Sequence, residues 1–323
     1  MKKFTVTITG ATGRLGAVVV TVLEKKFNLR LLARNVKKAK QLFPGKKVIE
    51  IDLENASVAQ VKKAVKGSWV VVHLAGLVDV CASRQRLFSV NYEATRKLVK
   101  ACEREKVPFF VHCSSIAVYG DSTNKISENT LLRPTSVYGQ SKLAAETVVK
   151  HSNLHWVMLR PGIIYGSHFT GGFFHVLEQM KRGSGQLIGK GDNFVPLVYE
   201  GDVANAFLKT LQLLRCGNKL SNQAFNIVSE NEPSQREALQ ALAKTFSLAV
   251  PSRSIPLRFA VGLAKLHSLY CSLRGRKNSF PAEYVYMLGK SRLYDTSKAK
   301  KMLKFTASTS LEKGLLEVKK SWG

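Results

Sequence analysis

Three side chains in the middle of the chain have the chemistry and spacing for proton transfer. Tyr138 and Lys142 stand four residues apart, and Ser115 lies upstream of both. On a helix, residues i and i+4 share a face, so the Lys142 ammonium can lie beside the Tyr138 ring. A neighbouring cation lowers the pKa of a tyrosine, and a serine hydroxyl can donate to an oxygen that develops negative charge. The trio therefore predicts acid–base chemistry on a hydroxyl or a carbonyl group.

A glycine-rich turn near the start of the chain predicts a dinucleotide site. Gly10, Gly13 and Gly16 follow a β-branched run and open a segment with helical spacing. In that context the glycines allow a tight turn, a close approach of backbone to a pyrophosphate and close helix packing. The pyrophosphate then lies against the helix N-terminus. The remaining residues of the predicted cofactor turn are Thr12, Arg14 and Leu15.

The residues after the second expected strand bear on the type of cofactor. An acidic residue at the end of this strand would bind the ribose hydroxyls of NAD, but the chain has Ala33, then Arg34 and Lys37-Lys38. Cationic residues in the absence of this acidic residue suit the 2′-phosphate of NADP. We therefore expect NADP(H) to be favoured over NAD(H), with Arg34 as a cofactor ligand.

Strands and helices alternate along the first half of the chain. This alternation predicts an α/β fold, a Rossmann-type doubly wound parallel sheet with a smaller C-terminal α/β substrate-binding domain. We place a nucleotide-binding domain at residues 1–165 and a substrate-binding region at 166–323, part of which returns to the first domain. The expected strands are 4–9, 29–33, 47–51, 69–73, 109–113 and 155–159, and long helices are expected over 84–105 and 136–151.

These motifs, in this order, resemble those of the extended short-chain dehydrogenase/reductase family over nearly the whole chain. The resemblance is carried by the glycine turn, by Asp52-Leu53, by His73-Leu74-Ala75-Gly76, and by the Ser115, Tyr138 and Lys142 trio. It is also carried by 91–95 (NYEAT) and 160–166 (RPGIIYG). It implies the fold already expected and a hydride-transfer activity that depends on NAD(P).

The resemblance also implies roles for individual residues. Asp52 contacts the adenine amine, with Leu53 next to it, and Ala75 and Gly76 line the cofactor. Lys142 also holds the nicotinamide ribose. The loop from Pro161, including Ile163, borders the nicotinamide. Ser115, four positions before the tyrosine of the SSIAVYG segment, matches the catalytic serine of the family.

Departures from the family pattern narrow the expected reaction. Acidic residues typical of the dehydratases are replaced by Ser115-Ile116-Ala117, and 189–199 lacks the arginine that binds the diphosphate of nucleotide sugars. These features resemble 3β-hydroxysteroid dehydrogenase-like and dihydroflavonol reductase-like members. We expect an oxidoreductase that interconverts a hydroxyl and a ketone on a bulky, largely apolar small molecule. The alternatives are a nucleotide-sugar 4-epimerase with tightly bound NAD and a non-enzymatic protein that senses NADP.

Composition limits the other classes of function. The 323-residue chain has 50 Lys and Arg against 22 Asp and Glu, a formal charge of +28, but it has no aromatic-basic pattern for stacking bases. We expect no specific nucleic-acid partner. The five cysteines lack the spacing of a disulfide framework or a zinc site. His151 and His155 have no third ligand nearby, so we also expect no metal site.

The segment 255–273 has one apolar stripe at helical spacing, flanked by basic residues. Such a stripe favours either the core of the substrate-binding domain or an interfacial helix that contacts an anionic membrane. No apolar run reaches membrane-spanning length, so we expect a soluble, cytoplasmic protein with peripheral membrane contact as the open alternative. Resemblance to the family further implies a homodimer formed through helices 84–105 and 136–151.

Overall fold

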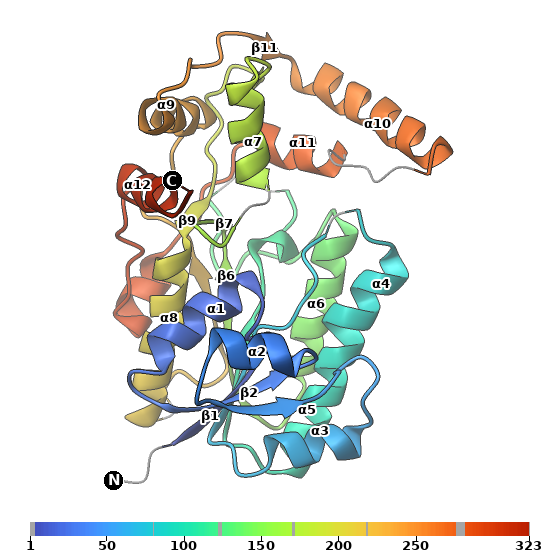
Figure 1. Ribbon diagram of the computed structural model, residues 1–323, viewed down its shortest axis with the longest axis vertical. Helices are drawn as coiled ribbons and strands as arrows, with labels where there is room; N and C mark the ends of the chain where they lie inside the picture. The colour runs from blue at the N-terminus through green and yellow to red at the C-terminus, as the bar shows by residue number, and fades with distance from the viewer. Residues whose placement is uncertain are drawn as a thin grey trace.

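The computed structural model describes residues 4–79, 81–121, 125–169, 172–217, 219–275 and 282–322. Figure 1 shows a lower part built around one sheet and an upper part made mainly of helices from the C-terminal half. Within the described ranges, no helix is long and apolar enough to cross a membrane.

Seven parallel strands form the central sheet in the order β10-β6-β5-β4-β1-β2-β3. Their interiors are β-branched and apolar, as expected for strands buried on both faces. This sheet confirms the predicted Rossmann-type α/β fold. The strands are β1 (Thr5–Thr9), β2 (Asn28–Ala33), β3 (Lys47–Glu50), β4 (Val70–His73), β5 (Phe109–Cys113), β6 (His155–Pro161) and β10 (Gln223–Ile227).

Helices cover both faces of the sheet. α1 (Arg14–Leu23) and α8 (Glu200–Arg215) pack together on one face. The other face is covered by α3 (Val58–Val65), α5 (Ala94–Arg104) and α6 (Val137–Lys150). α2 (Val36–Leu42) joins β2 to β3. The chain order reverses between β1 and β4, and in such sheets ligands bind in the crevice outside the carboxyl ends of the strands at this point.

The helix expected over 84–105 is interrupted. It consists of α4 (Arg84–Phe88), a π-helical turn η1 (Ser89–Glu93) and α5. The Asn91 side chain in this turn accepts from the Leu77 N–H at 2.7 Å and donates to the Leu77 carbonyl at 3.1 Å. The wider turn thus places Asn91 against the loop after β4. Periodicity could not reveal this, because the cause is a contact with a distant segment.

The upper part has its own apolar core. α7 (Gly172–Lys181), α9 (Gln235–Phe246) and α12 (Leu311–Trp322) bury leucines there together with Tyr165. Two-stranded sheets pair β7 (Ile163–Tyr165) with β9 (Leu197–Tyr199) and β8 (Leu187–Ile188) with β11 (Ser254–Ile255). The remaining elements are η2 (Ile116–Val118), α10 (Leu257–Leu273), α11 (Ala282–Gly289) and η3 (Ala299–Leu303).

The half-buried carboxyl of Glu232, which lies beyond β10, makes stability depend on pH. Burial raises the pKa of Glu232 from 4.5 to about 7, although its carboxylate accepts the Tyr294 N–H at 2.9 Å. The folded state therefore binds this proton more tightly, and stability falls as pH rises from about 4.5 to about 7. We expect Glu232→Gln to raise the free energy of unfolding by about 2 kcal/mol at pH 8.

Urea unfolding at pH 4.5 and pH 8 measures this effect. Glu230→Gln is the matched control, because Glu230 is exposed and pairs only at the surface with Lys300 at 2.9 Å. Its effect should stay below about 0.5 kcal/mol at both pH values. An equal gain from both variants would show that the Glu232 proton is not the cause.

Candidate active site

The glycine turn between β1 and α1 is packed against the loop that follows β4. Gly10 has a φ of +72°, and a Cβ on it would lie 2.5 Å from the Ala75 nitrogen. A Cβ on Gly16 would lie 2.0 Å from the Gly10 carbonyl oxygen. Both positions therefore require glycine. The same contacts bring the predicted cofactor residues of the turn and of the β4 loop together.

The start of α1 is suited to a phosphate group. Gly13 is the N-cap residue and makes no side-chain cap, and both Gly13 and Arg14 are exposed. The first backbone N–H groups of a helix lack intrahelical partners and carry the positive end of the helix dipole. A dinucleotide pyrophosphate fits this cradle. Thr12 and Leu15, on either side, are half-buried.

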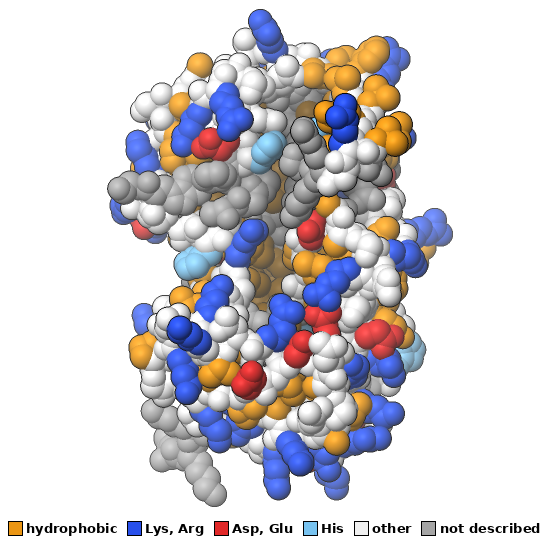
Figure 2. Space-filling view, turned by 45° about the vertical axis from the view of Figure 1, so that its right-hand side comes forward, with side chains coloured by type: hydrophobic (Ala, Val, Ile, Leu, Met, Phe, Trp, Pro, Cys, Tyr) orange, Lys and Arg blue, Asp and Glu red, His pale blue; other side chains and the backbone are white. Residues whose placement is uncertain are grey.

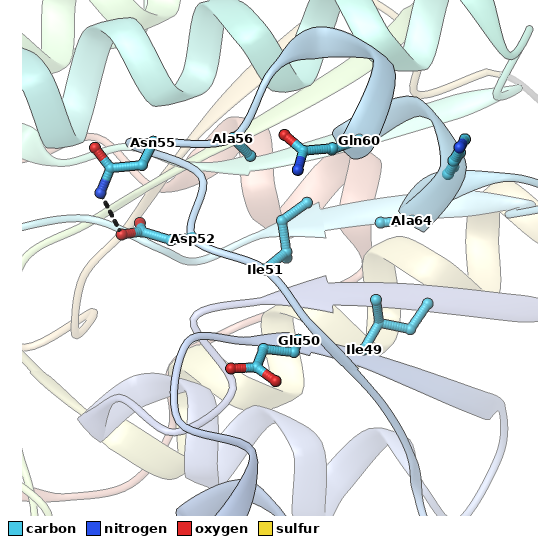
Figure 3. Close-up of a pocket in the computed structure, with 9 residues that line it drawn as sticks. Ile49, Glu50, Ile51, Asp52, Asn55, Ala56, Gln60 and Ala64 are labelled. Carbon is cyan, nitrogen blue, oxygen red and sulfur yellow. Dashed lines mark hydrogen bonds between the residues drawn. The ribbon is translucent and has the colours of Figure 1, made fainter.

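The predicted adenosine end of this crevice is formed by the residues that follow β2 and β3. Arg34 follows β2, is exposed, and pairs with Glu54 at 3.3 Å. The Asp52 carboxylate accepts from the Glu54 N–H at 3.1 Å and from the Asn55 side chain at 2.7 Å, while Leu53 is buried. Asp52 also borders an open pocket of about 530 Å³ between the end of β3 and α3 (Figure 3). These residues form one side of the predicted adenosine site.

Lys142 lies at the centre of the predicted catalytic group. Its side chain is buried, and its ammonium donates to the Cys113 carbonyl at 2.7 Å. Gly76 faces it, since a Cβ there would be 4.0 Å from the Lys142 Nζ. Burial lowers the pKa of Lys142, and the charge of Glu146 one helical turn further on opposes this. The structure therefore joins α6 to the ends of β4 and β5.

Tyr138 and Ser115 belong to two segments, α6 and η2, that pack directly on each other. Ser136 caps α6, since its side chain accepts from the Gly139 N–H at 3.0 Å. A Cβ on Gly139 would lie 2.4 Å from the Ala117 carbonyl oxygen, so the first turn of α6 lies directly on η2. The Ser115 hydroxyl, two residues before Ala117, accepts from the Ala117 N–H at 3.2 Å. Tyr138 and Ser115 are both half-buried.

The last predicted cofactor residues follow the neighbouring strand β6. β5 and β6 are paired with Cys113 beside Leu159, which places Pro161 next to the segment that begins at Ser114. Pro161 is buried and Ile163 half-buried, and the Ile163 N–H donates to the Pro196 carbonyl at 2.8 Å. The predicted residues thus follow the carboxyl edges of β1, β4, β5 and β6. Arg34, Asp52 and Leu53 lie further out, beyond β2 and β3.

Comparison with known proteins decides the family. The model of the NAD dependent epimerase/dehydratase family matches residues 6–227, which is more than half of the chain. The chain belongs to this family. The predicted resemblance to extended short-chain dehydrogenases/reductases is confirmed, and with it the prediction of an NAD(P)-dependent enzyme.

Proteins with different activities are similar to this chain. A 2-alkyl-3-oxoalkanoate reductase of Shewanella oneidensis is 27% identical over 86% of this chain and 76% of the reductase. The N-acetyl-alpha-D-glucosaminyl-diphospho-ditrans,octacis-undecaprenol 4-epimerase of Escherichia coli O157:H7 is 23% identical over 96% of this chain and 92% of the epimerase. The structure of UDP-glucuronic acid 4-epimerase from Bacillus cereus with NAD has a TM-score of 0.77 at 20% identity, covering 99% and 100% of the two chains. This last likeness shows the fold.

The sequence motifs include His73 and Asn91, but the sequence did not reveal that these side chains belong to a buried polar layer behind the site. His73 lies between the hydroxyls of Thr9, at 2.7 Å, and Thr95, at 2.8 Å. Burial, with a smaller effect of the Lys142 charge, lowers the pKa of His73 to about 3, so the imidazole stays neutral. Asn91 donates to the Ser141 hydroxyl at 3.0 Å and so ties α6 to the turn η1. These bonds fix the β4 loop and the α6 helix relative to each other.

An ion pair between Arg160 and Glu146 is buried beneath α6. Arg160 donates to both carboxylate oxygens of Glu146, at 2.8 and 2.6 Å, and both side chains are almost fully buried. The third Arg160 contact is with the Tyr119 hydroxyl at 2.7 Å, which donates to Asn226 at 2.7 Å. Burial raises the pKa of Tyr119 to about 12, which keeps it a neutral donor. The network joins α6, the η2 segment, β6 and β10.

A second missed group lies where α11 meets the loop that follows η2. The Asp121 carboxylate accepts from Tyr286 at 2.7 Å, Lys290 at 3.0 Å and Arg292 at 2.9 Å. Burial opposes ionisation of Asp121, but these hydrogen bonds outweigh it and hold its pKa below the usual value. Ser291, which lies between these two cations, contacts the segment 193–194, because the Phe194 N–H donates to its hydroxyl at 3.2 Å. Two cations therefore lie beside the segment that lacks the arginine of the nucleotide-sugar members.

Proposed function

We propose that the chain is a 4-epimerase that inverts a hydroxyl group on a sugar carried by a diphosphate. The observation that carries the proposal is the placement of Lys142, bonded to the Cys113 carbonyl and facing Gly76 one helical turn from Tyr138. In this proposal, Lys142 supplies a cation and Tyr138 a phenol to the crevice that the glycine turn borders. Near full-length similarity to the Escherichia coli 4-epimerase supports this reaction over the alcohol oxidation or ketone reduction of an apolar molecule that we favoured from the sequence.

The residues present have clear chemical tasks in such a reaction. NAD in the crevice would supply a hydride acceptor that returns the hydride to the opposite face of the same carbon, so that the alcohol is inverted without net oxidation. The Tyr138 phenolate takes the hydroxyl proton and later returns it to the ketone oxygen. The Ser115 hydroxyl donates to that oxygen while it is negatively charged. The Lys142 ammonium favours the phenolate.

We propose NAD as the retained cofactor. The expected preference for NADP depended on Arg34, Lys37 and Lys38 in place of an acidic residue after β2, but the Arg34 guanidinium is paired with Glu54. Glu54 also accepts from Arg86 and from Ser89, so it is firmly held in place next to Arg34. A 2′-phosphate at Arg34 would have to compete with this carboxylate. Ribose hydroxyls carry no charge and meet no such competition.

The Asp121 group offers a place for the diphosphate. Lys290 and Arg292 lie beside 193–194, and the Asn193 side chain donates to the Leu288 carbonyl at 2.6 Å. The Nε of Arg292 is buried and makes no hydrogen bond with any residue that the structure describes. Figure 2 shows the face between the two parts of the molecule hollowed, with Lys and Arg side chains around the recess. Cations at the rim of this recess suit the doubly charged diphosphate that stays attached to the sugar, which would share Lys290 and Arg292 with Asp121.

The nucleotide released from the purified protein on denaturation tests the proposal first. We expect near-stoichiometric NAD, identified by mass spectrometry, because an epimerase regenerates its cofactor in every cycle. Incubation with UDP-sugars and with a polyprenyl-diphosphate sugar should then interconvert the C4 epimers without added cofactor, as followed by NMR. Arg292→Leu should raise the KM for the diphospho-sugar by about tenfold or more, since it removes a charged hydrogen bond.

A second candidate is the NADP-dependent reduction of a ketone on an apolar molecule. The similarity to the Shewanella oneidensis reductase favours it. In that case the protein would be purified without nucleotide and would consume added NADPH in proportion to the ketone reduced. That result, together with no change in any diphospho-sugar, would contradict the epimerase proposal.

A further inference from the structure

Helix α10 exposes a continuous apolar face. Its members recur at spacings of three and four residues and are between 46% and 78% exposed. Gly262 lies within this face and has open space around it. We call this set the α10 apolar face: Phe259, Leu263, Leu266, Leu269, Tyr270 and Leu273.

The other side of α10 already has its packing partner. Ala264 and Cys271 are 3% and 4% exposed, and α10 lies against α11. Figure 1 shows α10 at the outer edge of the upper part, and Figure 2 shows hydrophobic side chains gathered at the upper right, where this helix lies. The interpretation of this stripe as domain core is therefore wrong. An apolar face of this size on an otherwise charged protein marks an interaction site.

The charge around the face identifies the chemistry of its partner. Residues 238–282 contain seven Lys and Arg and no Asp or Glu. By helical spacing, Arg258 and Lys265 lie along one edge of the α10 apolar face, and Arg274 lies along the other. The guanidinium of Arg258 lies 5.1 Å from the ring of Phe259, and that of Arg274 lies 5.7 Å from the ring of Tyr270. Apolar side chains between two basic edges suit a surface that is anionic outside and apolar beneath.

We propose that the α10 apolar face inserts into the headgroup region of an anionic lipid bilayer. A second copy of the chain is the less suitable occupant, because it would bring the same basic edges together on a protein of formal charge +28. Anionic headgroups neutralise these edges while the leucines enter the acyl boundary. The proposal does not depend on the reaction that the active site performs.

Helix α10 is connected through α11 to the loop that follows η2, on the same side of the molecule as the candidate active site. α11 packs along α10, and its Tyr286 donates to Asp121, which follows the η2 segment that begins after Ser115. Membrane docking through α10 would therefore place the bilayer beside the helix pair whose Tyr286 contacts Asp121. If the diphosphate of the proposed function is carried on a lipid, this position brings the sugar to the enzyme without extraction of the lipid.

Vesicle flotation of the full-length protein tests the docking surface. At low salt we expect it to float with phosphatidylglycerol/phosphatidylcholine vesicles, to remain in solution with phosphatidylcholine alone, and to be released as salt rises. The variant Leu263→Asp/Leu266→Asp should lower binding roughly tenfold or more, because it places carboxylates where the chain would enter lipid. Leu316→Asp on α12 is the matched control, since Leu316 is 51% exposed and far from α10.

Both variants are first compared with the natural protein by circular dichroism and thermal unfolding. Because the changed leucines are exposed, the three proteins should unfold alike. Failure of the natural protein to float, or equal flotation of the double variant, would overturn the proposal. So would a dimer in sedimentation that becomes a monomer in the double variant without any vesicle binding. Loss of sugar turnover alone would concern the proposed function and not the docking surface.

Discussion

Replacing Tyr138 with phenylalanine is expected to lower kcat about 10³-fold while the bound nucleotide is retained. The change removes only the hydroxyl that takes and returns the proton, so the ring still packs at the start of α6. Lys142 keeps its bond to the Cys113 carbonyl, and Gly76 and the glycine turn are untouched. Turnover of the sugar substrate is followed by NMR, and retained nucleotide is quantified after denaturation.

Tyr92→Phe is the matched control for this prediction. Tyr92 lies in the turn η1, and its ring packs against Phe88 with centroids 6.2 Å apart. The same atom is removed, but no proton-transfer site is affected, so kcat should stay within about twofold. Undiminished turnover in Tyr138→Phe would remove Tyr138 from the mechanism. Loss of nucleotide from this variant would instead indicate that the hydroxyl serves cofactor binding.

Features encoded in short segments could be predicted from the sequence. The β-branched run before Gly10 and the helical spacing after Gly16 predicted a strand, a tight turn and a helix, because each depends on neighbours in the chain. A strand was predicted over 69–73 for the same reason, and the structure has it over Val70–His73. Tyr138 and Lys142 were recognised as a pair because the helical repeat fixes their relation.

Features that depend on distant contacts could not be predicted in this way. The buried pair of Glu146 and Arg160 joins a helix to a strand, and each residue alone resembles an ordinary surface charge in the sequence. Asp121 meets its partners far along the chain, so the cations beside 193–194 were missed. Periodicity found the apolar stripe of α10 but could not determine which of its faces α11 covers.

Breaking the buried ion pair is expected to have the largest effect on stability. Glu146→Leu leaves the Arg160 guanidinium buried without its carboxylate, which should lower the free energy of unfolding by about 3–5 kcal/mol. Arg160→Met should do the same above neutral pH, because it leaves a buried carboxylate that must stay charged or bind a proton. Denaturant unfolding of both single variants and of Glu146→Leu/Arg160→Met completes a double-mutant cycle. The double variant should be more stable than either single one, since no unpaired charge remains.

The double variant also separates the structural role of the pair from its effect on Lys142. The charge of Glu146 opposes the lowering of the Lys142 pKa that burial causes. Without this charge the pKa of Lys142 falls further, so its ammonium is lost at a lower pH. We therefore expect the double variant to keep its fold while the alkaline limb of its kcat–pH profile moves to lower pH. Leu143→Met, on the same helix, leaves both charges in place and should not move that limb. An unchanged profile in a stable double variant would show that Glu146 acts only through packing, and that the charge state of Lys142 is set by the Cys113 carbonyl and by burial alone.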